Sequence, residues 1–276
     1  MTSWTRSIAA AVAVAAPFVA YSCPAEAGIG DLLVAPTRIV LDGRKGAEVV
    51  LNNIGEEPAV YRVSVEFRRM EKDGSLDDVT EPSAADKLAE DMIVYAPRRV
   101  TLAPHEPQSI RINARPPQGL ADGEYRVHLL FRAIPPSNPV AKQAGDADKG
   151  LRFQLTPVYG VTIPVIVRLG NLQATAGIAN VERSIGKDGK PVVSLDLTRS
   201  GTRSTFGEVR VLKAGFRDPV ALQKAIAVYT EINSRHVDVP LDPDFKGDLS
   251  GPVTVQYVET FEDGSHVIAE TRAVLR

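Results

Sequence analysis

The segment 61–68 reads Tyr61-Arg-Val-Ser-Val-Glu-Phe-Arg68, in which apolar and polar residues alternate at every position. Successive side chains of a β-strand point to opposite faces of its sheet, so this period of two predicts a strand with one buried and one solvated face. The segment 125–131 repeats the pattern, with Tyr125, Val127 and Leu129 alternating with polar residues. Together the two stretches indicate an antiparallel, all-β fold.

Similar short alternations follow one another along the chain, separated by turn residues. The 21 glycines and 20 prolines interrupt the apolar runs at the spacing expected of a β-sandwich. Only 84–92 and, less clearly, 220–227 look helical. The other predicted strands of the first half are 34–41, 49–51, 100–102, 110–112, 151–156 and 158–169.

Gly170-Asn171 ends the last of these strands and is the predicted boundary between two domains. A chain of 276 residues favours two medium domains over one large one. After the boundary the pattern again predicts short strands, so we expect a second sandwich covering 170–276. Its predicted strands are 192–197, 208–212, 227–231, 253–258 and 267–275.

Residues 1–27 have the pattern of a secretory signal peptide. A basic residue precedes the apolar run 8–20, and Ala25-Glu26-Ala27 places small residues at the two positions that a signal peptidase requires. We expect cleavage after Ala27, which leaves a first domain of 28–169. The apolar run is too short to span a bilayer comfortably. The single cysteine, Cys23, leaves with this segment, so the exported protein is expected to depend on burial without disulfides.

Composition and charge exclude some classes of partner. The chain has 32 basic and 34 acidic residues, a net charge of −2, so there is no strongly basic field for nucleic acid to bind. No later segment approaches transmembrane length, and we expect no stable membrane insertion.

The sequence contains no recognisable catalytic or metal-binding motif. It lacks a G-x-S-x-G elbow, an H-E-x-x-H pair and a phosphate-cradling G-x-x-x-x-G-K. The histidines have no second ligand at metal spacing, and His128 falls on the polar face of its strand, so solvated surface histidines are expected. We therefore predict a protein that is not an enzyme and needs no cofactor or metal. The four histidines are His105, His128, His236 and His266.

Five pieces in order over about 100 residues of the first domain resemble the N-terminal domain of periplasmic pilus (fimbrial) assembly chaperones of the chaperone–usher pathway. The second domain resembles this family more weakly, through Leu197-Thr-Arg-Ser-Gly201 and the segment 257–263. The five pieces are Val34-Ala-Pro-Thr-Arg-Ile-Val-Leu-Asp-Gly43, Asn52-Asn53, Tyr95-Ala-Pro-Arg-Arg-Val-Thr-Leu-Ala-Pro104, Gln108-Ser-Ile-Arg111, and Asp122-Gly-Glu-Tyr-Arg-Val-His-Leu129 through Ile134-Pro-Pro136.

The resemblance implies two immunoglobulin-like sandwiches that bind an unfolded pilus subunit in the cleft between them. Such a chaperone lends an edge strand to a subunit that lacks one, which is donor-strand complementation, a form of β-augmentation. It then delivers the subunit to an outer-membrane usher. The implied location is the periplasm, and no cofactor is implied.

The family anchors the carboxylate at the end of the subunit with two basic residues. Arg38 matches the first of these, and an arginine fork suits a carboxylate because it can donate two parallel hydrogen bonds. Pro164 occupies the position of the second, normally a lysine, and offers neither charge nor backbone donor. The alternative for Arg38 is a solvated arginine on an edge strand.

Two further sets of residues follow from the resemblance. Leu151, Phe153 and Leu155 form one wholly apolar face of the predicted strand 151–156 and match the donor strand. The alternative is that this face packs into the core of the first domain. In the family, an arginine at the end of the first domain forms ion pairs with acidic residues of both domains. The residues that match this ion cluster here are Glu124, Arg168 and either Glu262 or Asp263.

Two readings from other classes stay open. The same sandwiches could serve as spacers in an exported adhesion or scaffold protein, which a missing subunit or usher partner would favour. A hydrolase could also assemble its site from scattered residues, which activity-based probes on the mature protein would detect.

Overall fold

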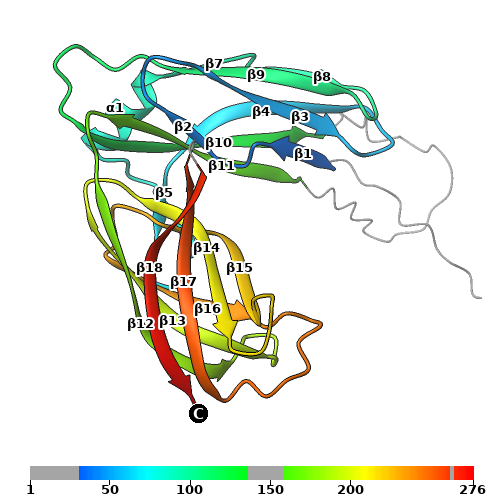
Figure 1. Cartoon of the computed structure of the whole chain (residues 1–276). Coiled ribbons are helices and arrows are strands. Elements are labelled where there is room, and N and C mark those ends of the chain that lie inside the picture. Colours follow the sequence, from blue (N-terminus) through cyan, green and yellow to red (C-terminus); the bar gives the residue numbers. More distant parts are fainter. Residues whose placement is uncertain (1–30, 136–157, 262–263) are drawn as a thin grey trace, which may run out of the picture.

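The computed structural model describes residues 31–135, 158–261 and 264–276, and these residues form two β-sandwiches that meet at an angle (Figure 1). The all-β prediction is confirmed. The predicted signal peptide, the donor-strand segment and the pair Glu262–Asp263 lie outside the described residues. Within the described residues no helix is long and apolar enough to cross a membrane.

The first sandwich has two sheets whose strand order is that of an immunoglobulin-like domain. The first sheet is β1 (Leu32–Ala35), β3 (Ala47–Asn53), β9 (Pro107–Ala114) and β7 (Ile93–Ala96). The second sheet is β2 (Ile39–Leu41), β11 (Gly160–Leu169), β10 (Gly123–Ile134), β4 (Ala59–Glu66) and β8 (Arg99–Leu102). In the lettering of the immunoglobulin fold, β1, β3, β9 and β7 are strands A, B, E and D of one sheet. Strands C, F and G of the other sheet are β4, β10 and β11.

The first predicted strand, 34–41, is divided between these sheets. Its first part, β1, pairs with β3, and its second part, β2, runs parallel to β11. Only residues 165–167 of β11 pair with β2. The edge of β11 from Gly160 to Pro164 therefore faces no described strand.

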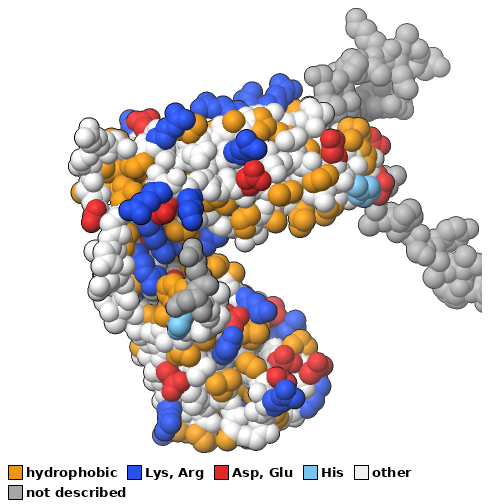
Figure 2. Space-filling model, turned by 45° about the horizontal axis from the view of Figure 1, so that its top comes forward, with side chains coloured by type: hydrophobic (Ala, Val, Ile, Leu, Met, Phe, Trp, Pro, Cys, Tyr) orange, Lys and Arg blue, Asp and Glu red, His pale blue; other side chains and the backbone are white. Residues whose placement is uncertain are grey.

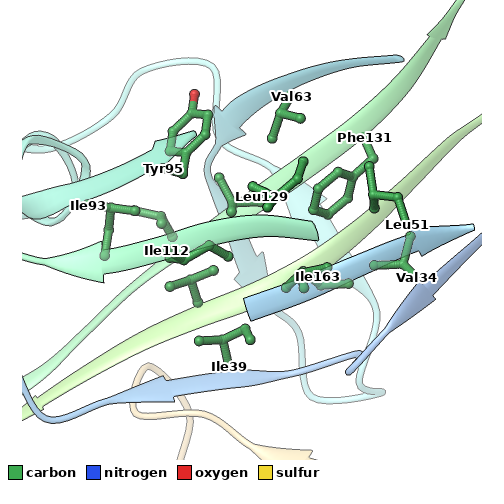
Figure 3. Close-up of a cluster of buried hydrophobic side chains, with 14 of the residues drawn as sticks. Val34, Ile39, Leu51, Val63, Ile93, Tyr95, Ile112, Leu129, Phe131 and Ile163 are labelled. Carbon is green, nitrogen blue, oxygen red and sulfur yellow. The ribbon is translucent and has the colours of Figure 1, made fainter. Parts of the chain in front are cut away.

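Alternating side chains of both sheets fill the core of the first sandwich (Figure 3). Ile112 and Leu51 from one sheet meet Leu129, Phe131 and Ile163 from the other, and all five are fully buried. The stretches 61–67 and 125–131 thus point their apolar residues inward as their period of two predicts.

The predicted helix 84–92 is confirmed as α1 (Ala84–Met92). Ser83 begins it with a capping box, because its hydroxyl accepts from the Asp86 amide and the Asp86 carboxylate accepts from the Ser83 amide. The suggested helix 220–227 is wrong, because this segment forms the strand β15 (Ala221–Val228). Its Ala, Leu, Gln and Lys residues have high helix propensity, but pairing with a neighbouring strand and burial of Ile226 outweigh that preference.

The second sandwich has a sheet of three strands packed on a sheet of four. Strands A, B and E form the smaller sheet, and the larger has the order D-C-F-G, again an immunoglobulin-like arrangement. The smaller sheet is β12 (Ala174–Ile185), β13 (Pro191–Gly201) and β16 (Ser234–Pro240). The larger is β15 (Ala221–Val228), β14 (Thr205–Lys213), β17 (Gly251–Phe261) and β18 (Gly264–Leu275).

A tight turn joins the sandwiches where Gly170-Asn171 was predicted to end the first domain. Gly170 has a φ of +79°, and a Cβ there would lie 1.9 Å from a carboxylate oxygen of Asp122. Both observations require glycine at this turn. The core of the first sandwich draws on residues between 34 and 167, and that of the second on residues between 193 and 275.

A third, smaller apolar cluster lies at the junction of the sandwiches. Ile166 and Met70 of the first sandwich pack there against Ala227 and Tyr229 of the second. Met70 belongs to a hairpin of β5 (Arg68–Met70) and β6 (Leu76–Asp78) that also reaches the second sandwich, since the Lys72 carbonyl accepts from the His236 amide at 2.7 Å.

Candidate binding site at the domain junction

Arg38 lies at the junction of the two sandwiches. Ile39 of β2 is paired in parallel with Val165 of β11, which places Arg38 beside Pro164 at the start of that pairing. Its guanidinium carbon lies 4.5 Å from the centroid of the Phe206 ring in the second sandwich. Nη2 of Arg38 donates to the Ser204 hydroxyl at 3.3 Å. The side chain therefore bridges both sandwiches and is not a solvated arginine on an edge strand.

The other end of the Arg38 fork is buried without a partner. Its Nη1 is inaccessible to solvent and has no hydrogen bond to any described residue. Burial lowers the pKa of the Arg38 guanidinium, and the nearby charge of Arg168 lowers it further. An unsatisfied buried donor on a cation favours an anion as its partner.

A cavity of about 380 Å³ opens beside this guanidinium. Arg38 and Arg168 both line it, as do two aromatic rings of the second sandwich. Figure 2 shows Lys and Arg side chains gathered in the angle between the two sandwiches. We call this cavity the junction site; its lining residues are Pro36, Thr37, Arg38, Val40, Arg168, Phe206, Glu259, Thr260 and Phe261.

Two members of the predicted ion cluster, Glu124 and Arg168, form an ion pair, and Arg168 lines the junction site. They are direct neighbours on β10 and β11, and Nε of Arg168 donates to Glu124 at 2.9 Å. The same carboxylate oxygen accepts from the Ser204 amide at 2.9 Å, and Nη2 of Arg168 donates to the Ser204 carbonyl at 3.0 Å. The ion pair is thereby joined to the second sandwich through backbone groups.

In the described part of the second sandwich, the acidic residue that lines the junction site is Glu259. Its two oxygens accept three hydrogen bonds from Arg203, each of 3.0 Å. Glu262 and Asp263, the predicted third members of the cluster, are not among the described residues. Around the junction site the described residues therefore include three arginines, at 38, 168 and 203, and two glutamates, at 124 and 259. Among these five residues, one positive charge is therefore not balanced by a carboxylate.

A second set of contacts holds the opposite side of the junction. Arg126 on β10 donates to Glu231 at 3.0 Å and lies 3.7 Å from the ring centroid of Tyr229. The Met70 amide donates to the same carboxylate at 2.9 Å. Burial opposes ionisation of Glu231, but the hydrogen bonds and charge of Arg126 outweigh it and hold the pKa below its usual value.

The prediction that His128 is a solvated surface residue is wrong. Its side chain is on the outer face of β10, as the alternation indicates, but only 1% of the residue is exposed because the second sandwich covers it. The ring meets Tyr229 edge-on, at 6.5 Å between centroids. Burial, with the charges of Arg126 and Arg68, lowers the pKa of His128 to about 3.

Two other histidines, His236 and His105, have carboxylates nearby, but the described residues contain no group that could hold a metal ion. His236 lies 3.0 Å from Asp196 and 3.4 Å from Asp238, and half of its side chain is exposed. His105 lies 3.6 Å from Glu56 on the surface.

Sequence reasoning missed Ser204, Phe206 and Glu259. They reach the junction site only because the two sandwiches dock in one particular way, and local periodicity does not encode docking. The one available signal was Glu259, a carboxylate directly after the apolar strand predicted at 253–258.

The predicted donor residues Leu151, Phe153 and Leu155 lie outside the described residues. The described chain resumes at Val158 and Tyr159, which are both exposed, and continues into the unpaired edge of β11.

No family model and no curated protein matches the chain. Several solved structures are similar to it. The Salmonella enterica SafB chaperone in complex with the SafA pilin has 14% identity and a TM-score of 0.44, with 90% of this chain and 97% of that chain covered. The YadV chaperone has 14% identity and a TM-score of 0.44, with 89% and 100% covered. The Pseudomonas aeruginosa CupB2 chaperone has 12% identity and a TM-score of 0.43, with 88% and 100% covered. The immunoglobulin-like assignment of both sandwiches rests on their own strand order.

Proposed function

We propose that this chain is a periplasmic chaperone that binds and stabilises pilus subunits by donating an edge β-strand and delivers them to an outer-membrane usher. Its two domains are 28–169 and 170–276, after a signal peptide of 1–27. The subunit occupies the angle between the domains. The role requires no covalent chemistry and no cofactor, and the chain is not an enzyme.

The observation that carries the proposal is the buried, unpartnered Nη1 of Arg38 in the junction site. A chain terminus entering the site brings a carboxylate, which supplies both the missing acceptor and the missing negative charge. Charge-assisted hydrogen bonds of this kind are about twice as strong as neutral ones. Arg38 is therefore the anchor of the subunit's terminal carboxylate.

A second cation is needed because Pro164 cannot act as one. Arg168 fills this role in the proposal: its Nη2 and the Nη2 of Arg38 both lie 3.3 Å from the Ser204 hydroxyl, so the two guanidinium groups converge. Both line the junction site. Nη1 of Arg168 has no hydrogen bond to a described residue and is available to the carboxylate.

The unpaired edge of β11 supports strand donation. A sheet edge presents free N–H and C=O groups that pair with another chain. A subunit whose terminus is held at Arg38 lies next to Pro164 and can extend along this edge. Leu151, Phe153 and Leu155 remain the proposed donor residues.

The test is capture of a subunit from the periplasm. The tagged mature protein should co-purify with proteins that mass spectrometry identifies as pilus subunits, and Arg38→Ala should lose them. Arg111→Ala is the matched control, since Arg111 is an exposed arginine of β9 in the other sheet. If Arg38→Ala recovers as much subunit as the wild type, Arg38 is not the anchor. If the wild type recovers no subunit, the proposed function is wrong.

A further inference from the structure

Three arginines lie side by side across neighbouring strands of the first sandwich. Arg132 of β10 is directly opposite Arg62 of β4, and Arg62 is directly opposite Arg99 of β8. Opposed residues of antiparallel strands share one face of the sheet, and adjacent strands are about 5 Å apart. The three side chains therefore leave the same face as a row, which we call the arginine ladder.

The ladder is not neutralised by the described residues. All three arginines are exposed, and none has a hydrogen bond or ion pair within the described part of the chain. Several other arginines of the described chain are paired with a carboxylate, such as Arg69 with Asp86 at 2.6 Å. Like charges directly opposite each other destabilise a sheet, so the ladder is unfavourable in the isolated molecule.

The surface around the ladder is apolar or neutral. On the same face of β10 the neighbours of Arg132 are Leu130 and Ile134, both half-buried. The nearest carboxylate on this face, Glu66, is already held by Arg68 and by the Thr162 hydroxyl, each at 2.7 Å. A basic row within a partly apolar surface has the composition of a protein interface, where arginine is enriched.

We propose that the arginine ladder is a docking surface for an acidic segment of a partner protein. Each planar guanidinium can bind one carboxylate through two parallel hydrogen bonds. A row of three arginines can therefore bind three successive acidic side chains. A membrane surface is the less suitable partner, because lipid-binding clusters usually contain about 4–8 basic residues. The ladder is separate from the junction site, so this inference goes beyond the proposed subunit anchor.

The test uses a fluorescently labelled poly-L-glutamate peptide as the probe, with binding to the mature protein followed by anisotropy. The ladder variant Arg62→Gln/Arg99→Gln/Arg132→Gln should bind at least about tenfold more weakly than wild type, since it loses charge-assisted hydrogen bonds. The matched control Arg217→Gln/Lys224→Gln/Arg272→Gln removes the same charge from exposed positions of the second sandwich and should bind as the wild type does.

Three results would overturn the proposal: no binding by the wild type, an equal loss in both triple variants, or ladder-dependent binding of phosphatidylglycerol vesicles in preference to the peptide. The ladder variant should unfold at a higher temperature than the wild type because repulsion is removed. If it does not fold, the single variant Arg62→Gln, which removes the central charge, takes its place. An amidated C-terminus keeps the probe from offering a terminal carboxylate to the junction site, and Arg38→Ala should bind this peptide as the wild type does, so the outcome is separate from subunit capture.

Discussion

At Arg38 the contacts to the second sandwich and the burial of charge act in opposite directions. The hydrogen bond to Ser204 and the stacking on Phe206 stabilise the folded protein. Desolvation of the guanidinium and repulsion by Arg168 destabilise it. Because these effects offset each other, Arg38→Ala should change the free energy of unfolding by no more than about 1 kcal/mol. The residue is positioned for a ligand more than for its own fold.

The anion preference of the junction site can be measured with a matched pair of small molecules. N-acetyl-leucine carries a terminal carboxylate, whereas N-acetyl-leucinamide does not. The wild type should bind the acid more tightly than the amide, and Arg38→Ala should abolish this difference while Arg111→Ala keeps it. The measurement is a chemical-shift titration of the mature protein. Equal binding of acid and amide by the wild type would contradict the anchor.

His128 should make the protein sensitive to acid. Its pKa is lowered to about 3 in the folded protein, so the neutral form is favoured there more than in the unfolded chain. The resulting stability is fully present above the unfolded pKa of about 6.5 and is lost as the pH falls toward 3. Between pH 7 and pH 4 this amounts to about 3 kcal/mol.

His128→Leu removes the titrating group from the same buried position. Urea unfolding at pH 7 and pH 4 should show that the variant loses about 3 kcal/mol less than the wild type over this interval. Phe216→Leu, a change at an exposed position without a titrating group, is the control and should keep the wild-type pH dependence. An identical pH dependence for His128→Leu would mean that the ring is not buried.

At the scale of elements, strict alternation of apolar and polar residues predicted strands correctly. The strands that were not predicted lack a clear alternation. Tyr61–Glu66 and Tyr125–Phe131 became the central strands of the first sandwich, because their period of two matches the two faces of a sheet. β12 was missed since its Ala- and Gly-rich sequence from Ala174 lacks this period. β16 was missed because only Val237 and Val239 carry its alternation before it ends at Pro240.

Alternation also distinguishes the two faces of a strand, but it does not indicate what covers the face that points away from the core. Glu124, Arg126 and His128 were correctly placed on the polar face of one strand. That face lies under the second sandwich, and no pattern within the strand signals it. The ion pair of Glu124 with Arg168 could be anticipated from the family resemblance, whereas Ser204 could not, since it lies in the connection between β13 and β14.

The proposed donor strand makes a prediction at the same scale. Phe153→Asp should prevent capture of pilus subunits, because a charged side chain cannot enter the apolar core of a subunit. It should leave the unfolding temperature of the protein nearly unchanged. Phe216→Asp, at an exposed phenylalanine of the second sandwich, is the control and should retain capture. A Phe153→Asp protein that unfolds would assign this residue to the core and favour the spacer role.

For the whole molecule, the ion pair of Arg168 and Glu124 should fix the angle between the sandwiches. Only 1% of the Glu124 side chain is exposed, so Arg168→Ala leaves a buried carboxylate without its cation. We expect a loss of about 3 kcal/mol in the free energy of unfolding and a wider distribution of shapes in small-angle X-ray scattering. Arg168→Ala/Glu124→Gln should recover most of the stability. Unchanged stability and scattering for the single variant would show that the pair does not hold the junction.

The third apolar cluster means that neither sandwich is a self-contained module. Ile166 points outward from β11, yet it is fully buried, because Tyr229 and Ala227 of the other sandwich cover it. A chain truncated after Leu169 would place Ile166 and the ring of His128 in water on one continuous surface. Exposed patches of this kind promote aggregation. Separate expression of either half should therefore yield poorly soluble protein, and in the cell a polypeptide released early from the ribosome would be a substrate for proteases.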